Sequence, residues 1–301
     1  MTSASTSVTV RVPAKVNVQL AVGGARADGF HDLANVFLAV GLYDEVTVSA
    51  ADSFALTCTG PGSDQVPLDR TNLAARAAFA LAERHGLGEP TVHIHIAKDI
   101  PVAGGMAGGS ADAAGALLAC DALWGTNTSR SELLDICAEL GSDVPFSLVG
   151  GAALGTGRGE KLELLDVGGE FWWVFAAADG GLSTPAVYGE FDRLSPDAPD
   201  PVAAPALLAA LRTGDVEALA ATVTNDLQPA ALSLFPSLKD TLEAGRSAGA
   251  LAALVSGSGP TTAFLAADES AARAVATALT GADVCRTARV APSPAPGATI
   301  L

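Results

Sequence analysis

The sequence KDIPVAGGMAGGSAD, residues 98–112, carries the strongest functional signal in the chain. It has four glycines within six residues, and it lies between a predicted strand over 91–96 and a predicted helix over 110–124. Glycines let backbone N–H groups approach phosphate oxygens because no Cβ intervenes, and a helix N-terminus favours negative charge. The segment therefore predicts a phosphate-binding loop. The alternative is a glycine-rich turn that serves only close packing.

Two common nucleotide-binding motifs do not describe this loop. Gly104 and Gly109 have the spacing of a Walker A motif, but Ser110 and Ala111 stand where that motif has Lys followed by Ser or Thr. The dinucleotide-binding order G-x-G-x-x-G does not occur in residues 98–112 either. At the start of the predicted helix, Ser110 and Asp112 can equally serve as capping residues.

Apolar and alternating runs on both sides of the loop predict a mixed α+β fold in two lobes. Strands are expected over 8–12, 15–22, 36–42, 46–49, 91–96, 146–154, 172–177, 251–255, 261–265 and 284–290. Helices are expected over 71–86, 110–124, 129–141, a short stretch from 184, 206–212, 216–223, 238–248 and 269–279. The tail from Pro292 is rich in Pro and Gly, so we expect it to be loosely held. The predicted domains are 1–160 and 161–301.

Composition and charge restrict the classes of partner. The chain of 301 residues has 33 acidic and 17 basic side chains, for a net charge of −16, which disfavours nucleic acid and anionic lipid as main partners. The N-terminus has no signal-peptide pattern and no apolar stretch approaches bilayer length, so a cytoplasmic protein is expected. His93 and His95 have the spacing of a metal site, but no third ligand follows nearby, so we expect an exposed sheet face and no resident metal. The sequence leaves the oligomeric state open.

Two further segments strengthen the interpretation of residues 98–112 as a phosphate-binding loop. VPAKVNV (residues 12–18) and SGSGPT (residues 256–261) flank the loop at a distance. In this order the three segments resemble the motifs of the GHMP kinases, which include galactokinase, homoserine kinase and mevalonate kinase. The resemblance implies an N-terminal lobe like ribosomal S5 domain 2 that binds ATP, with Mg²⁺ as the companion of ATP. It also implies a ferredoxin-like C-terminal lobe, with the acceptor in the cleft between the lobes.

Other segments resemble one branch of this family, whose acceptor is a small cytidine-diphosphate-linked alcohol. They are RADGFH (26–31), KDIP (98–101), LGSDVPF (140–146), GTGRGE (155–160) and NDL (225–227). A kinase of the homoserine or mevalonate type is an alternative, although such enzymes have no cytosine to hold. A non-catalytic nucleotide sensor on the same fold is another. Lys15 and Asp143 argue against the sensor, because a binding module needs no base.

The resemblance assigns the chemistry to two charged residues. It makes Asp143 the catalytic carboxylate within reach of the acceptor hydroxyl, and it places Lys15 beside Asp143, where an ammonium stabilises the acceptor oxygen. Taken alone, Asp143 would be an ordinary loop aspartate and Lys15 a surface lysine whose stem packs on a strand. Asn17 lies two residues after Lys15, hence on the same strand face.

The resemblance also assigns the binding residues. Those expected to bind ATP are Lys98, Pro101, Val102, Ala103, Gly104, Gly105, Met106, Ala107, Gly108, Gly109, Ser110 and Ala111. Lys98 would lie near the adenosine end, or else be a solvated surface charge. Ala107 stands where the family has Gly, and its Cβ disfavours a positive φ.

The acceptor side is predicted from five residues, Asn17, Phe30, His31, Tyr188 and Thr261. Phe30 and Tyr188 would lie on the two faces of a cytosine, because stacking uses the π-face of each ring. His31 would reach the edge of the base. The alternative is that the two aromatic rings belong to the core and that His31 is a solvated loop residue.

Overall fold

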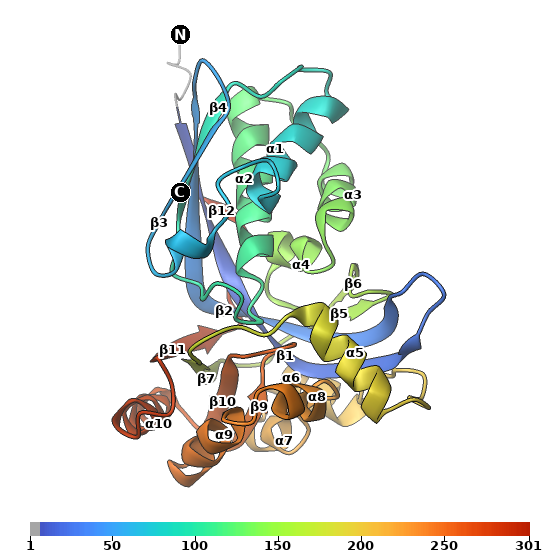
Figure 1. Cartoon of the computed structure of the whole chain (residues 1–301), viewed down its shortest axis with the longest axis vertical. Coiled ribbons are helices and arrows are strands. Elements are labelled where there is room, and N and C mark those ends of the chain that lie inside the picture. The colour runs from blue at the N-terminus through green and yellow to red at the C-terminus, as the bar shows by residue number, and fades with distance from the viewer. Residues whose placement is uncertain (1–6) are drawn as a thin grey trace.

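In the computed structural model, which describes residues 7–301, a long antiparallel hairpin of β1 (Ser7–Ala25) and β2 (His31–Ala50) forms the spine of the molecule (Figure 1). The sequence predicted four shorter strands here. The register shifts at three places, one of them between Pro13 and Ala14, so β-bulges absorb the residues that interrupt the pattern. Gly29, with φ 81°, closes the turn of the hairpin. The two strands of the hairpin therefore stay continuous across the bulges.

The remaining strands of the first sheet attach along this hairpin. They are β3 (Ala55–Thr59), β4 (Val92–Ala97), β5 (Ala152–Thr156), β6 (Lys161–Leu164), β8 (Thr224–Asn225) and β12 (Thr299–Ile300). The order is β12-β1-β2-β4-β3, while β5 pairs with the other half of β2 and with β6, and β8 pairs with β1. The division of the chain at residue 160 stays a prediction.

One face of the first sheet is covered by helices (Figure 1). They are α1 (Leu73–Arg84), α2 (Gly108–Trp124), α3 (Arg130–Leu140) and α4 (Val144–Val149), and the 3₁₀ turn Ser63–Gln65 precedes them. Side chains cap two of these helices, because Asn72 accepts from Ala74 N at the start of α1 and Ser129 accepts from Glu132 N at the start of α3. The core of this layer is rich in Ala and Val, and α2 is buried along most of its length.

The strand predicted over 146–154 is wrong. Residues Val144–Val149 form α4, Gly150 and Gly151 take positive φ angles of 68° and 66°, and β5 begins only at Ala152. A short, fully apolar run shows no periodicity that separates a buried helical turn from a buried strand. The consequence for function is that Asp143 lies at the start of a helix.

A second, four-stranded antiparallel sheet completes the fold. It consists of β7 (Phe171–Ala177), β9 (Ala252–Val255), β10 (Thr262–Ala266) and β11 (Thr287–Ser293), in the order β11-β7-β10-β9. Side chains alternate along β7, so Trp173 and Phe175 pack toward the first sheet while Val174 packs toward α9 (Leu238–Ser247) and α10 (Glu269–Gly281). Both faces of this sheet are therefore buried.

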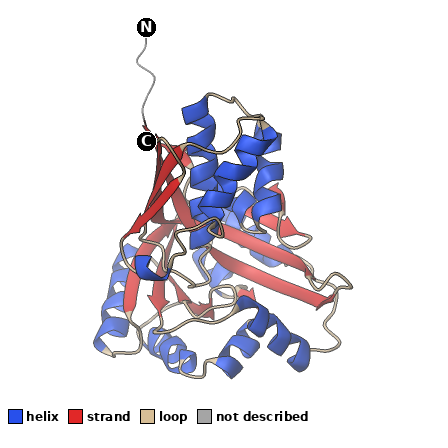
Figure 2. Ribbon diagram, turned by 45° about the horizontal axis from the view of Figure 1, so that its top comes forward, coloured by secondary structure: helices blue, strands red, loops and turns tan. Residues whose placement is uncertain are grey.

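The other helices lie around the second sheet, and the long hairpin runs between the two groups of helices (Figure 2). They are α5 (Thr184–Leu194), α6 (Pro205–Thr213), α7 (Val216–Ala220) and α8 (Gln228–Leu234), of which α8 was not predicted. Among residues 7–301, no helix has the length and apolar character to span a bilayer.

The loosely held tail expected beyond Pro292 is also wrong. Ala295 is buried, Pro296 bridges to Gly150, and β12 pairs with β1. A Cβ built on Gly297 would lie 2.4 Å from the backbone carbon of Val149, so only glycine fits there. Pro and Gly in this tail therefore serve tight packing against α4.

Candidate active site

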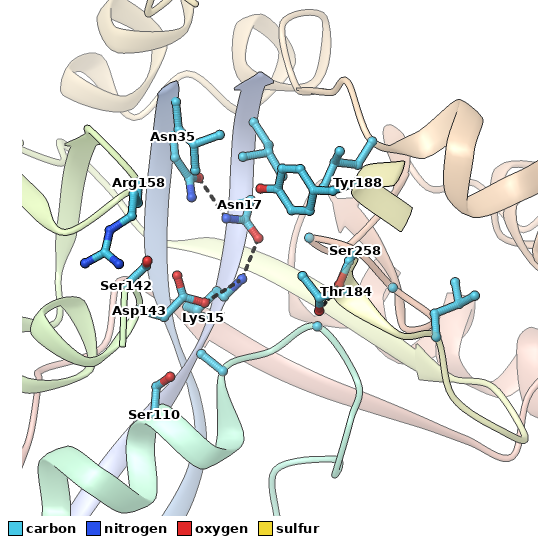
Figure 3. A pocket seen from close by; sticks show the side chains of 18 of the residues that line it. Lys15, Asn17, Asn35, Ser110, Ser142, Asp143, Arg158, Thr184, Tyr188 and Ser258 are labelled. Carbon is cyan, nitrogen blue, oxygen red and sulfur yellow. Dashed lines mark hydrogen bonds and ion pairs between the residues drawn. The ribbon is translucent and has the colours of Figure 1, made fainter. Parts of the chain in front are cut away.

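A cavity of about 590 Å³ lies where the first sheet, the glycine-rich loop and α5 meet (Figure 3). Its volume is in the range of small-molecule sites. Most of the residues predicted from the sequence line it. They are Lys15, Asn17, Phe30, His31, Ala103, Gly104, Gly105, Ala107, Gly108, Gly109, Ser110, Asp143 and Tyr188.

The three sequence motifs meet at this cavity. The N–H of Lys15 donates to Met106 O over 3.3 Å, which ties the N-terminal motif to the glycine-rich loop. The hydroxyl of Ser256 donates to Gly105 O over 3.1 Å, which ties the C-terminal motif to the same loop. Gly257 packs so closely that a Cβ there would lie 3.3 Å from Lys15 Nζ. Segments far apart in the sequence thus form one site.

The two residues predicted to be catalytic face each other in the cavity (Figure 3). Lys15 Nζ lies 3.5 Å from Asp143 Oδ2 and donates to Asn17 Oδ1 over 2.6 Å. Lys15 is 5% exposed, so the interpretation as a surface lysine is wrong. Asp143 makes no helix-capping bond at the start of α4, and its side chain is 31% exposed, so its carboxylate remains available to a ligand.

A residue that was not predicted completes this group. Asn17 Nδ2 donates to Asn35 Oδ1 over 2.7 Å, and Asn35 is buried in β2. The chain of bonds from Asn35 through Asn17 fixes the ammonium of Lys15 in place. The sequence held one signal for this residue. Asn35 is the single Asn within the apolar run of residues 33–42, and a buried amide requires a hydrogen-bond partner.

The glycine-rich loop turns sharply to present the start of α2. Ala103, Gly105 and Ala107 have φ angles of 52°, 71° and 61°. The expectation that Ala107 would avoid a positive φ is therefore wrong. Ala107 is held there by its neighbours, since Ala111 N donates to its carbonyl and Met106 is tied to Lys15. The first N–H groups of α2 have no partner within the helix, so they can bind an anion.

Not every predicted loop residue reaches the main cavity. Met106 and Ala111 are fully buried in the core, and Pro101 is half-buried. Lys98 and Val102 line a second, smaller cavity of about 230 Å³. Thr261 is 1% exposed behind the loop, and its hydroxyl has no partner among the described residues.

Lys98 belongs to a buried cluster of charges beneath the loop. Its Nζ lies 2.5 Å from Asp44 Oδ2 and 2.9 Å from Asp112 Oδ2, so the interpretation as a solvated surface charge is wrong. Asp44 also accepts from the N–H groups of Asp99 and Ile100. Burial alone would lower the pKa of Lys98, but the charges of Asp112 and Asp44 outweigh burial and hold it above its ordinary value. The cluster ties β2, the start of the loop and α2 together.

Asp112 should make stability depend on pH. Burial raises its pKa from 3.8 to about 7, against the attraction of Lys98, so the folded state retains a proton that the unfolded state has lost. The stability contributed by this group is therefore present at acid pH and is lost as pH rises toward 7. We expect the free energy of unfolding of Asp112→Asn, relative to that of the wild type, to increase as pH rises from about 4 to about 7. Urea unfolding across this pH range measures the difference in free energy of unfolding between the variant and the wild type. A difference that does not change with pH would contradict a raised pKa of Asp112.

Gly108 has a packing role that the sequence did not reveal. A Cβ there would lie 3.0 Å from Lys98 Nζ and 3.2 Å from Ile100 Cγ2, so a side chain points into the protein and not into the cavity. We expect Gly108→Val to lose about 1–3 kcal/mol of stability through overpacking. Gly109→Ala is the matched control, because the nearest atom is 3.7 Å away. Equal melting temperatures for the two variants would show that the loop shifts to accommodate a side chain at position 108.

Aromatic and basic side chains line the other end of the cavity. The rings of His31 and Tyr188 lie 4.8 Å apart, and the Arg158 guanidinium lies 4.8 Å from the ring centre of Phe30. Phe30 is 47% exposed and His31 is buried, so the alternative of a core Phe30 and a solvated His31 is wrong, whereas Tyr188 is half-buried and packs against the core around the second sheet. Burial raises the pKa of the Tyr188 phenol above its ordinary value, which keeps it neutral. Arg158 and Asp192, which bonds to His31, were not predicted as site residues.

The sequence and the fold both match known kinases. Residues 72–151 match the GHMP kinases N terminal domain, and residues 207–283 match the GHMP kinases C terminal family. A protein named 4-diphosphocytidyl-2-C-methyl-D-erythritol kinase from Streptomyces avermitilis is 80% identical over 98% of this chain and 100% of its own length. The protein of the same name from Streptomyces coelicolor is 73% identical over 98% of this chain and 99% of its own.

Solved structures agree on the fold. A crystal structure of 4-(cytidine 5'-diphospho)-2C-methyl-D-erythritol kinase matches with a TM-score of 0.77 and 34% identity, over 95% of this chain and 99% of that one. A homoserine kinase from Cytophaga hutchinsonii has the same TM-score of 0.77 at 21% identity, over 100% of this chain and 99% of that one, and so shows the fold alone. Structural similarity does not distinguish the branches of this family, but sequence identity does. The chain belongs to the GHMP kinases and, among them, to the family of 4-diphosphocytidyl-2-C-methyl-D-erythritol kinases.

Proposed function

We propose that this chain transfers the γ-phosphoryl group of ATP to the 2-hydroxyl of 4-diphosphocytidyl-2-C-methyl-D-erythritol, in the non-mevalonate route to isoprenoid precursors. The observation that carries the proposal is the Lys15–Asp143 pair, 3.5 Å apart in a cavity that the glycine-rich loop also lines. The relatives of 80% and 73% identity supply the acceptor by their names. A cytoplasmic location without nucleic-acid partners belongs to the same proposal.

We assign one of the two adjoining cavities to each substrate. Ala103 and Gly109 line both of them, so the glycine-rich loop is the boundary where the two cavities adjoin. ATP would place its adenosine in the smaller cavity near Lys98 and its phosphates on the loop and the start of α2. The acceptor would occupy the larger cavity, with its base near Phe30, His31 and Tyr188. In this arrangement the γ-phosphate faces Asp143.

The chemistry at the acceptor follows from this placement. The 2-hydroxyl is a tertiary alcohol, which is a crowded nucleophile, so its orientation matters as much as its basicity. Asp143 accepts a hydrogen bond from this hydroxyl and takes its proton as the phosphoryl group transfers. Lys15 lies beside the same oxygen and stabilises the negative charge that develops there. Asn17 and Asn35 hold Lys15 in position.

The residues present suit Mg²⁺ that arrives with ATP. Among residues 7–301 there is no group of three or more His, Cys, Asp or Glu that could hold a metal unaided. The hydroxyl of Ser110 faces the cavity and would offer Mg²⁺ an oxygen ligand beside the phosphates of ATP, while Asp143 stays free to take the acceptor proton. When bound, Mg²⁺ neutralises charge on the phosphates. Lys15 and Arg158 supply the local positive charge in a chain of net charge −16.

An acceptor panel tests the proposed function. ADP release is measured with Mg-ATP and, in turn, 4-diphosphocytidyl-2-C-methyl-D-erythritol, mevalonate, homoserine and galactose. We expect acceptor-dependent ADP release with the cytidine compound and only background with the others. Release with mevalonate or homoserine instead would favour another branch of the family. No acceptor-dependent release with any of them would favour a nucleotide sensor.

A further inference from the structure

His31 is held by a carboxylate that no sequence motif indicated. Its Nε2 lies 2.8 Å from Asp192 Oδ1, which comes from α5, while His31 begins β2. The His31 side chain is 6% exposed, whereas that of Asp192 is 40% exposed. The ring of Tyr188 lies 4.8 Å from that of His31, and the ring of Phe191 meets it edge-on at 6.1 Å. The imidazole is therefore fixed on several sides.

This contact decides which ring nitrogen carries the proton. An ionised carboxylate only accepts hydrogen bonds, so Nε2 must be the N–H that points to Asp192. In the neutral ring, Nδ1 then has a free lone pair. No described residue bonds to Nδ1, and His31 lines the main cavity. The ring thus offers a ligand an acceptor in place of a donor.

We propose that Asp192 is a positioning residue that sets base specificity, by holding His31 in the tautomer whose Nδ1 accepts a hydrogen bond from the exocyclic amino group of a cytosine. This inference rests on the proposed function, which places a cytidine group here. Uracil has a carbonyl oxygen where cytosine has the amino group. That oxygen and Nδ1 of His31 are both hydrogen-bond acceptors, so no hydrogen bond would form between them. Asp192 itself contacts no reacting atom, and its effect passes through His31.

Asp192→Asn is the direct test, because the amide keeps the shape but can either donate to Nε2 or accept from it. The bias toward one tautomer is then lost. We expect the ratio of inhibition constants for UMP and CMP, measured against the cytidine-linked acceptor, to fall about tenfold toward unity. The KM for ATP and the melting temperature should change little. Glu190→Gln is the matched control on the same helix, because Glu190 bonds to Arg193 and Ser233 and not to His31.

A spectroscopic measurement reads the tautomer itself. The chain has four histidines, so ¹⁵N resonances of the ring nitrogens can be assigned by single substitutions. We expect a protonated Nε2 and an unprotonated Nδ1 in His31 of the wild type, and a mixture in Asp192→Asn. A protonated Nδ1 in the wild type, or an unchanged UMP to CMP ratio in the variant, would overturn the inference. If the wild type does not phosphorylate the cytidine-linked acceptor at all, the proposed function itself fails.

Discussion

Asp143→Asn is expected to lower kcat by about 10²–10⁴-fold, which is the usual contribution of a general base. The amide keeps the volume and the position at the start of α4, but it cannot take the proton of the acceptor hydroxyl. Asp143 makes no helix-capping bond, so we expect the substitution to keep the fold, with a modest fall in melting temperature because the buried Lys15 loses its ion-pair partner. Steady-state kinetics at saturating substrates measures kcat, and isothermal titration should show that ATP still binds.

The control for this variant is Glu139→Gln. Glu139 lies on α3 with 63% of its side chain exposed and pairs with Arg84, so removing its charge should change kcat by less than about twofold. More than about a tenth of wild-type kcat in Asp143→Asn would show that this carboxylate only orients the acceptor.

Lys15→Met is expected to lower kcat by a similar factor, about 10²-fold or more, because the developing charge on the acceptor oxygen loses its cation. Methionine fills the volume of the stem, since Lys15 is nearly fully buried. Asn17 Oδ1 loses its donor, so a modest fall in melting temperature should accompany the kinetic effect.

The matched control for Lys15→Met is Lys161→Met in β6, where the lysine is exposed. Its kinetic constants should equal those of the wild type. If Lys15→Met and Lys161→Met both retained wild-type kcat, the ammonium of Lys15 would have no part in the transfer.

The sequence predicted the central parts of this site because each motif is local. The glycine-rich loop lies between a strand and a helix as expected, and the helix after it begins at Gly108, two residues earlier than predicted. Lys15 and Asn17 share a strand face as their spacing predicted, and their side chains are bonded to each other. Periodicity of two along a strand is sufficient for such statements.

Features that depend on distant pairs were not predictable in this way. Asp44 lies 54 residues from Lys98 and turns an apparent surface lysine into a buried ion cluster. Asp192 lies 161 residues from His31, and nothing in its neighbourhood marks it as a partner. Ala107 takes a left-handed conformation that its own side chain disfavours, because surrounding contacts impose it. Tertiary contacts, which local patterns do not encode, decide all three.

The position of the new phosphate tests the central claim most directly. The product made from 4-diphosphocytidyl-2-C-methyl-D-erythritol and Mg-ATP is purified, and its proton-coupled phosphorus NMR spectrum is recorded. The carbon that bears the 2-hydroxyl also bears the methyl group and has no proton. We therefore expect a new monoester resonance without splitting from protons on the carbon that carries the phosphate. A monoester resonance split into a doublet or a triplet would place the phosphate on the 3- or the 1-hydroxyl and would contradict the proposed arrangement of acceptor, Asp143 and ATP.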